Sequence, residues 1–170
     1  MTLVRRIATL AAATALAVAV PAGATSVVRL PLARVAGAAA RIVHATVVDV
    51  RAGRDDAGLP ATWITLDVAR TLKGGAERRI VFKQYGVADP LPDGTVARVP
   101  GLPRYAVGDE IVVFLHGESR RGFTSPVGLA QGVYRVEHRG ARASVRDDGV
   151  TRGRRDLEAF LDDVGRLVGR

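Results

Sequence analysis

The sequence contains no cysteine, few aromatic residues and almost no lysine. The lack of cysteine excludes a disulfide framework, a thiolate metal site and a cysteine nucleophile. Aromatic residues make up 5% of the 170 residues, which leaves few rings for stacking on nucleic-acid bases. Hydrophobic residues reach 48%, which is too high for a disordered chain. We therefore expect a folded domain with an apolar core.

Only one long stretch lacks charged residues, and it lies at the start of the chain. Two arginines precede the apolar residues 7–20, and a proline and the small residues 22–24 follow them. This layout is typical of a secretory signal peptide cleaved after Ala24. A retained membrane anchor is the alternative, but a spanning helix needs about 20 apolar residues. We therefore expect a signal peptide over 1–24, a single exported domain over 25–170, and a location in the periplasm or outside the cell.

The basic residues are strongly skewed towards arginine. Lys73 and Lys83 are the only lysines among 25 basic side chains. Removal of the signal peptide leaves 23 basic and 17 acidic side chains, which is a net charge of +6. Arginine favours bidentate contact with carboxylate, sulfate or phosphate. GC-rich codon usage and a solvated charged surface explain the same skew without a function.

Alternating aliphatic residues predict a mainly β fold. We expect strands at 42–50, 63–72, 80–85, 95–99 and 110–116, and a hairpin around Arg139-Gly140. Helical spacing of apolar residues predicts a short helix within 31–40 and an amphipathic helix at the C-terminus. The expected architecture is a small, closed or nearly closed Greek-key, OB-like antiparallel barrel of six or seven strands.

Two of these strands allow more detailed predictions. Residues 111–115 are apolar on both faces, which predicts a central strand covered on both sides. In the hairpin, Tyr134 opposite Val145 separates an apolar face from a polar one, and Glu137 then lies opposite Arg142.

Three motifs resemble a known group of proteins. They are LKG at 72–74, GLPRY at 101–105 running into VGDEIVVFL at 107–115, and VGLAQGVYRV at 127–136. In this order, behind a signal peptide, they resemble a group of uncharacterised exported bacterial proteins. That resemblance implies an OB-type barrel, more loosely similar to netrin-like domains and tissue inhibitors of metalloproteinases, and implies no particular activity. Those inhibitors use an N-terminal cysteine, which this chain lacks.

The chain offers little that points to catalysis or metal binding. His44, His116 and His138 have no metal-ligand spacing, and no serine lies in a Gly-x-Ser-x-Gly turn. We therefore expect no metal and no cofactor, and an unrecognised hydrolase is the least favoured alternative.

Binding to an exported or envelope protein is the favoured function. The Pro- and Gly-rich segment 86–104 is too long for an ordinary connection, and such loops are often functional. Arg98, Arg104 and Tyr105 are the expected anchors, because tyrosine and arginine often dominate interfaces. The alternative is that Arg104 and Tyr105 brace the loop against the sheet.

Binding to a polyanion is the second hypothesis. The candidate residues are arginines of the last third of the chain, namely Arg120, Arg121, Arg135, Arg142 and Arg146. In an exported protein, an anionic polysaccharide or lipid surface fits this chemistry better than nucleic acid does.

Overall fold

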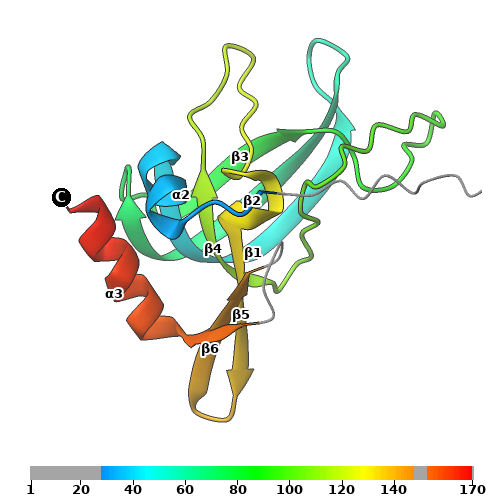
Figure 1. Ribbon diagram of the computed structural model, residues 1–170. Coiled ribbons are helices and arrows are strands. Elements are labelled where there is room, and N and C mark those ends of the chain that lie inside the picture. The colour runs from blue at the N-terminus through cyan, green and yellow to red at the C-terminus, as the bar shows by residue number, and fades with distance from the viewer. Residues whose placement is uncertain (1–27, 148–152, 170) are drawn as a thin grey trace, which may run out of the picture.

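The computed structural model describes residues 28–147 and 153–169 (Figure 1). The expected signal peptide lies outside the described residues. In chain order the elements are α2 (Leu32–Ala38), β1 (Arg41–Arg54), β2 (Pro60–Lys73), β3 (Arg79–Tyr85), β4 (Glu110–Leu115), the 3-10 helix η1 (Leu129–Gly132), β5 (Val133–Arg139), β6 (Arg142–Asp147), β7 (Arg154–Asp156) and α3 (Leu157–Val168).

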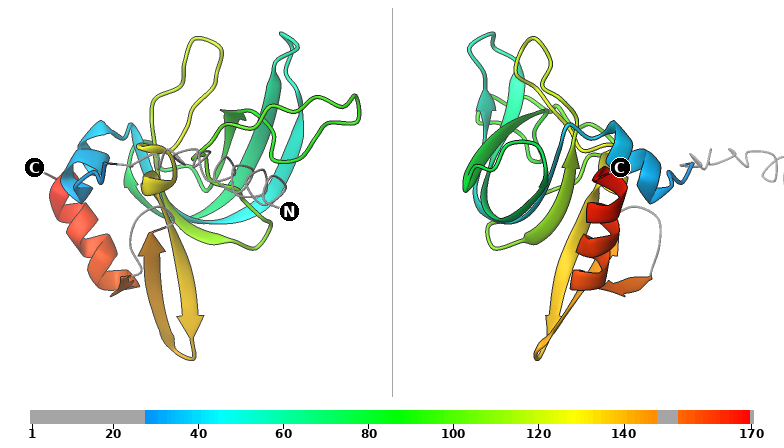
Figure 2. Two further views of the ribbon diagram at one scale, coloured as in Figure 1. Left: turned by 45° about the vertical axis from the view of Figure 1, so that its right-hand side comes forward. Right: turned by 90° about the vertical axis from the view of Figure 1, so that its left-hand side faces the viewer.

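The strands of the described residues form one antiparallel sheet in the order β3-β2-β1-β4-β5-β6-β7. The mainly β class is therefore confirmed. The sheet is not closed, because β3 and β7 are its two edges and do not pair with each other. The expected closed barrel is thus not confirmed, although β1 to β4 curl strongly in the right-hand view of Figure 2.

A bulge in β1 contributes to this curl. Val47 lies opposite Leu66 and Asp49 lies opposite Thr65, so Val48 is an extra residue without a partner on β2. An extra residue of this kind bends its strand and increases the local twist. The bulge faces the turn before β4, where the Val47 amide donates to the Asp109 carbonyl at 2.8 Å.

The central strand β4 separates two apolar clusters. Ile111, Val113 and Leu115 point into an inner cluster within the curl, together with residues of β1, β2 and β3. Val112 and Phe114 point into a helix-side cluster, which includes residues of α2 and α3. All five side chains are buried, as the apolar pattern of residues 111–115 predicts.

Both expected helices are present, and α3 covers the helix-side cluster. Leu157, Phe160, Leu161 and Val164 are buried there. The helix begins at a capping residue, since the Asp156 carboxylate accepts a hydrogen bond from the Ala159 amide at 3.0 Å. In the described part of the chain, no helix has the length and apolar character needed to cross a bilayer.

Three strand predictions need correction. Residues 95–99 form no strand, because hydrogen bonds within the loop hold their backbone, such as the one from the Val87 amide to the Ala97 carbonyl. The short strand β7 was not expected.

The hairpin pairs Val136 with Val145, two positions away from the expected register. Gly140 adopts φ 59° at the first position of the turn, and a shift of two keeps each side chain on its expected face. Glu137 consequently lies opposite Ser144, and the expected cross-strand pair with Arg142 does not form.

Candidate functional site

The long segment between β3 and β4 is held in place by polar contacts. Arg54 at the end of β1 contacts the Asp93 carboxylate at 2.8 Å and the Thr95 hydroxyl at 2.6 Å. Hydrogen bonds from Thr95, together with the Arg54 guanidinium, lower the pKa of Asp93 to about 2. The Val87 amide donates to the Ala97 carbonyl at 3.0 Å. These contacts therefore give the loop a defined conformation.

The three expected anchors take part in this bracing. Arg98 and Arg104 both donate to the carbonyl of Ala88, at 3.0 and 3.2 Å. The Tyr105 ring packs edge-on against Phe82 at 5.6 Å, beside the inner cluster. The structure thus brings the three residues together around one loop. A role in partner binding stays a prediction for them.

A pocket of about 280 Å³ lies beside this loop, at the end of β3. We call it the Gln84 pocket. It is formed by Gln84, Tyr85, Val99, Leu102, His116, Gly117, Phe123, Thr124, Ser125 and Leu129. Its residues come from β3, from the long loop, from the loop after β4 and from η1, so four distant parts of the sequence meet here.

Gln84 is the unusual polar residue of this pocket. Only 6% of its surface is exposed, and it lies on the same face of β3 as the buried Ile80 and Phe82. Its side-chain oxygen Oε1 is buried and accepts no hydrogen bond from the described residues. A buried acceptor without a donor costs about 1–3 kcal/mol. A ligand whose donor reached Oε1 would therefore remove this cost.

An aromatic pair forms one wall of the pocket. The rings of Tyr85 and Phe123 meet edge to face at 5.8 Å, and Tyr85 remains 45% exposed. The ammonium group of Lys83 lies 4.2 Å from the centre of the Phe123 ring and contacts the Asp55 carboxylate at 3.0 Å. The hydrogen bond from Lys83 is the main cause of the lowered pKa of Asp55. The wall is thus held in position although it faces solvent.

Leu129 completes the pocket in a strained conformation. Its φ of 60° lies in the left-handed region, and it is the only residue other than glycine there in the described ranges. A bulky residue in this region costs about 1–2 kcal/mol. The side chain is nevertheless 41% exposed, so burial does not compensate for the strain. Strain of this kind is often found at functional sites.

A second groove runs along the free edge of β3 and meets the Gln84 pocket at His116, Gly117 and Thr124. We call it the edge groove, and its volume is about 650 Å³. The Lys83 carbonyl points outward, because it accepts a hydrogen bond from the Thr124 amide at 2.8 Å. Backbone groups alternate in direction along an antiparallel strand. Those of Arg79 and Val81 therefore also point away from β2, into the edge groove.

The arginines proposed for polyanion binding do not form one face. Arg120 and Arg121 lie in the loop after β4, and Arg142 lies at the tip of the β5–β6 hairpin, at the opposite end of the molecule (Figure 1). Arg135 contacts the Asp109 carboxylate at 2.6 Å, and Arg146 contacts Glu137 at 3.1 Å. The sequence does not indicate that these arginines lie far apart, because their separation depends on the hairpin and the loop after β4 extending in opposite directions.

A cluster missed at the sequence level joins three strands. The Glu110 carboxylate lies 2.7 Å from Nε2 of His44 and, through its other oxygen, 2.7 Å from Nε2 of His138. Within the described residues, no group of three or more His, Asp or Glu side chains is placed to hold a metal ion. The three residues are widely separated in sequence, so only the pairing of β1, β4 and β5 brings them together.

Comparisons with protein-family models, with curated proteins and with solved structures found no match for this chain.

Proposed function

We propose that the protein is an exported binding module that captures an extended segment of another protein. The segment would lie in the edge groove along β3 and place an apolar side chain in the Gln84 pocket. The observation that carries this proposal is the buried Oε1 atom of Gln84, which has no donor among the described residues and belongs to a residue that lines a mainly apolar pocket.

The chemistry of the pocket favours a peptide over other ligands. Its acceptor is a neutral amide oxygen, which suits a neutral N–H donor such as a backbone amide. Its walls are aromatic and aliphatic, with Tyr85 and Leu129 partly exposed to receive an apolar side chain. The edge of β3 next to it offers the outward backbone groups of Arg79 and Val81 for pairing, which is a common way of binding extended peptides.

A library of random linear peptides displayed on phage supplies the probe. The protein comprising residues 25–170 would be panned, and the enriched peptides would be synthesised and measured by calorimetry. We expect peptides with an aromatic or large aliphatic anchor. Gln84→Met keeps the size of the side chain but removes the acceptor, so binding should weaken about tenfold, as expected for a lost hydrogen bond of about 1.5 kcal/mol.

Gln84→Met should also be more stable than the wild type, although it binds peptide less tightly. Removal of a buried acceptor without a donor should raise the free energy of unfolding by about 1–3 kcal/mol in urea denaturation. Val107→Ser is the matched control, since Val107 is 67% exposed and does not line the pocket. Equal peptide binding by the wild type, Gln84→Met and Leu129→Ser would contradict the proposed site.

The finer fold and the location belong to the same proposal. The order β3-β2-β1-β4 places a fourth strand beside the first of three hairpin-linked strands, which supports a Greek-key unit of OB type. The segment after β4 bridges towards β3 at Lys83 and Phe123, which supports partial closure of a barrel.

Export through a signal peptide is the other part of the proposal. Sequencing the N-terminus of the exported protein would test cleavage after Ala24, and a start at another residue would contradict it.

A further inference from the structure

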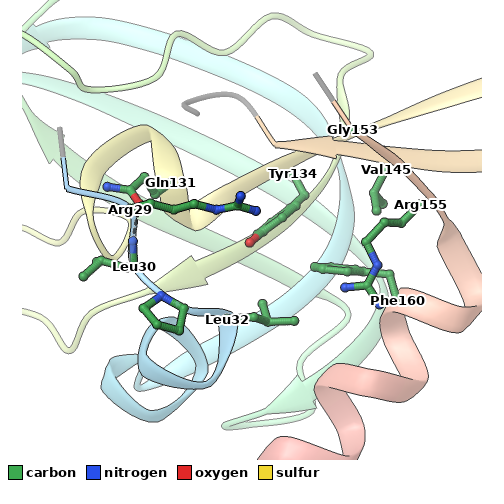
Figure 3. Close-up of a pocket in the computed structure, with 10 residues that line it drawn as sticks. Arg29, Leu30, Leu32, Gln131, Tyr134, Val145, Gly153, Arg155 and Phe160 are labelled. Carbon is green, nitrogen blue, oxygen red and sulfur yellow. Dashed lines mark hydrogen bonds between the residues drawn. The ribbon is translucent and has the colours of Figure 1, made fainter. Parts of the chain in front are cut away.

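The helix-side cluster carries a different cavity, away from the edge groove (Figure 3). Its volume is about 360 Å³, within the usual range for small-molecule sites. We call it the Arg29–Arg155 pocket. Its walls are Arg29, Leu30, Pro31, Leu32, Gln131, Tyr134, Val145, Gly153, Arg155 and Phe160. These residues come from the start of α2 and the segment before it, from η1, from β5 and β6, from β7 and the residue before it, and from the first turn of α3.

The two arginines give this pocket a positive charge. Among the described residues, none of those that line it is acidic. Arg29 forms no ion pair or hydrogen bond within the described residues, and its side chain extends towards Tyr134 in Figure 3. The Arg155 guanidinium lies 5.3 Å from the centre of the Phe160 ring, and within the described residues the carboxylate that it contacts is that of Asp163. Guanidinium donors therefore approach the cavity from two segments of the chain.

Aromatic and aliphatic side chains form much of the rest of the pocket, and they are held in position. The rings of Tyr134 and Phe160 lie 4.5 Å apart, and Phe160 is fully buried. Gln131 fixes the segment that carries Arg29, because its amide accepts from the Leu30 amide at 2.8 Å and donates to the Val28 carbonyl at 3.1 Å. The aliphatic side chains of Leu32 and Val145 add to the apolar surface. A ligand here would meet guanidinium groups as well as aromatic and aliphatic surface.

From this arrangement we propose that the Arg29–Arg155 pocket binds a small carboxylate with a hydrocarbon body. Arginine pairs with carboxylate through two parallel hydrogen bonds. The aromatic and aliphatic walls would bury the hydrocarbon. This site is separate from the peptide site of the preceding section, since the two lie over different apolar clusters.

Octanoate below its micelle concentration is the probe, measured by calorimetry at low salt with the protein comprising residues 25–170. Octanamide has the same body without the charge, and acetate has the charge without the body. We expect octanoate to bind at least about tenfold more tightly than either. Arg29→Gln and Arg155→Gln should each weaken octanoate binding by about the same factor.

Arg34→Gln is the matched control, because Arg34 is an exposed arginine of α2 that does not line the pocket. It should leave octanoate binding unchanged. Equal binding of octanamide would overturn the role of the arginines, and equal binding of acetate would overturn the role of the hydrocarbon walls. Circular dichroism of each variant distinguishes a lost site from a lost fold. No detectable octanoate binding by the folded wild type overturns the proposal as a whole.

Discussion

At the scale of single residues, Glu110 links three strands through one carboxylate. Burial raises its pKa, but the hydrogen bonds with His138 and His44 outweigh this effect, so the pKa lies below its usual value. A carboxyl group whose pKa is lower in the folded state stabilises the fold at pH values above its unfolded pKa, which is about 4.3. That contribution is lost as the pH falls through the lower folded pKa.

This predicts a pH-dependent difference between the wild type and Glu110→Gln. As the pH falls below about 4.3 and through the lower folded pKa of Glu110, the free energy of unfolding should fall more for the wild type than for the variant, whereas above about pH 5 the difference should stay constant. Urea denaturation followed by Trp63 fluorescence at a series of pH values measures both. Glu118→Gln is the control, because Glu118 has no ion pair or hydrogen bond among the described residues. A constant difference between the wild type and Glu110→Gln at all pH values would contradict the prediction.

Residue types alone pointed to few of these side chains. Gln84 alternates with Ile80 and Phe82 along a strand, so its burial was predictable, but the lack of a donor was not. Leu129 follows a glycine in the VGLAQGVYRV motif, yet its left-handed conformation depends on the chain around it. Tyr105, Arg98 and Arg104 were found by residue type. Their contacts within the loop required the folded path of the backbone.

At the scale of elements, β3 is an edge strand whose outward N–H and C=O groups at Arg79 and Val81 face the edge groove, whereas Lys83 is bridged to the loop after β4. Val81→Pro removes one such N–H, while the ladder to β2 uses the alternate residues. The variant should stay folded and should bind the selected peptides about tenfold less tightly. Val81→Thr keeps the N–H and should bind like the wild type. Unchanged binding by Val81→Pro would limit the peptide to the Gln84 pocket and contradict pairing with β3.

Element types were more predictable than their partners. The alternating patterns located the long strands and the hairpin, because burial of one face requires that periodicity. The hairpin register was wrong by two because the same faces result from either register, and only the turn at Gly140 distinguishes them. Residues 95–99 were expected to be a strand from their composition. Contacts such as Arg54 with Asp93 instead hold that region as a loop.

At the scale of the whole molecule, two apolar clusters share one strand. Alternate side chains of β4 enter the inner cluster and the helix-side cluster. Loss of packing on one side should therefore weaken the pairing of β4 with β1 and β5, on which both clusters depend. We therefore predict that the protein unfolds as a single cooperative unit, which would agree with one domain over residues 25–170.

Phe114→Ala tests this cooperativity. Phe114 is fully buried in the helix-side cluster, where its ring lies 6.4 Å from that of Phe160. The substitution should lower the free energy of unfolding by about 3–5 kcal/mol. Trp63 lies on β2, and its fluorescence reports on the curled part of the sheet, while far-UV circular dichroism also reports on the helices. Both signals should shift to the same lower urea concentration. If the Trp63 transition stayed at its wild-type midpoint, the two clusters would unfold independently and the single-domain description would be wrong.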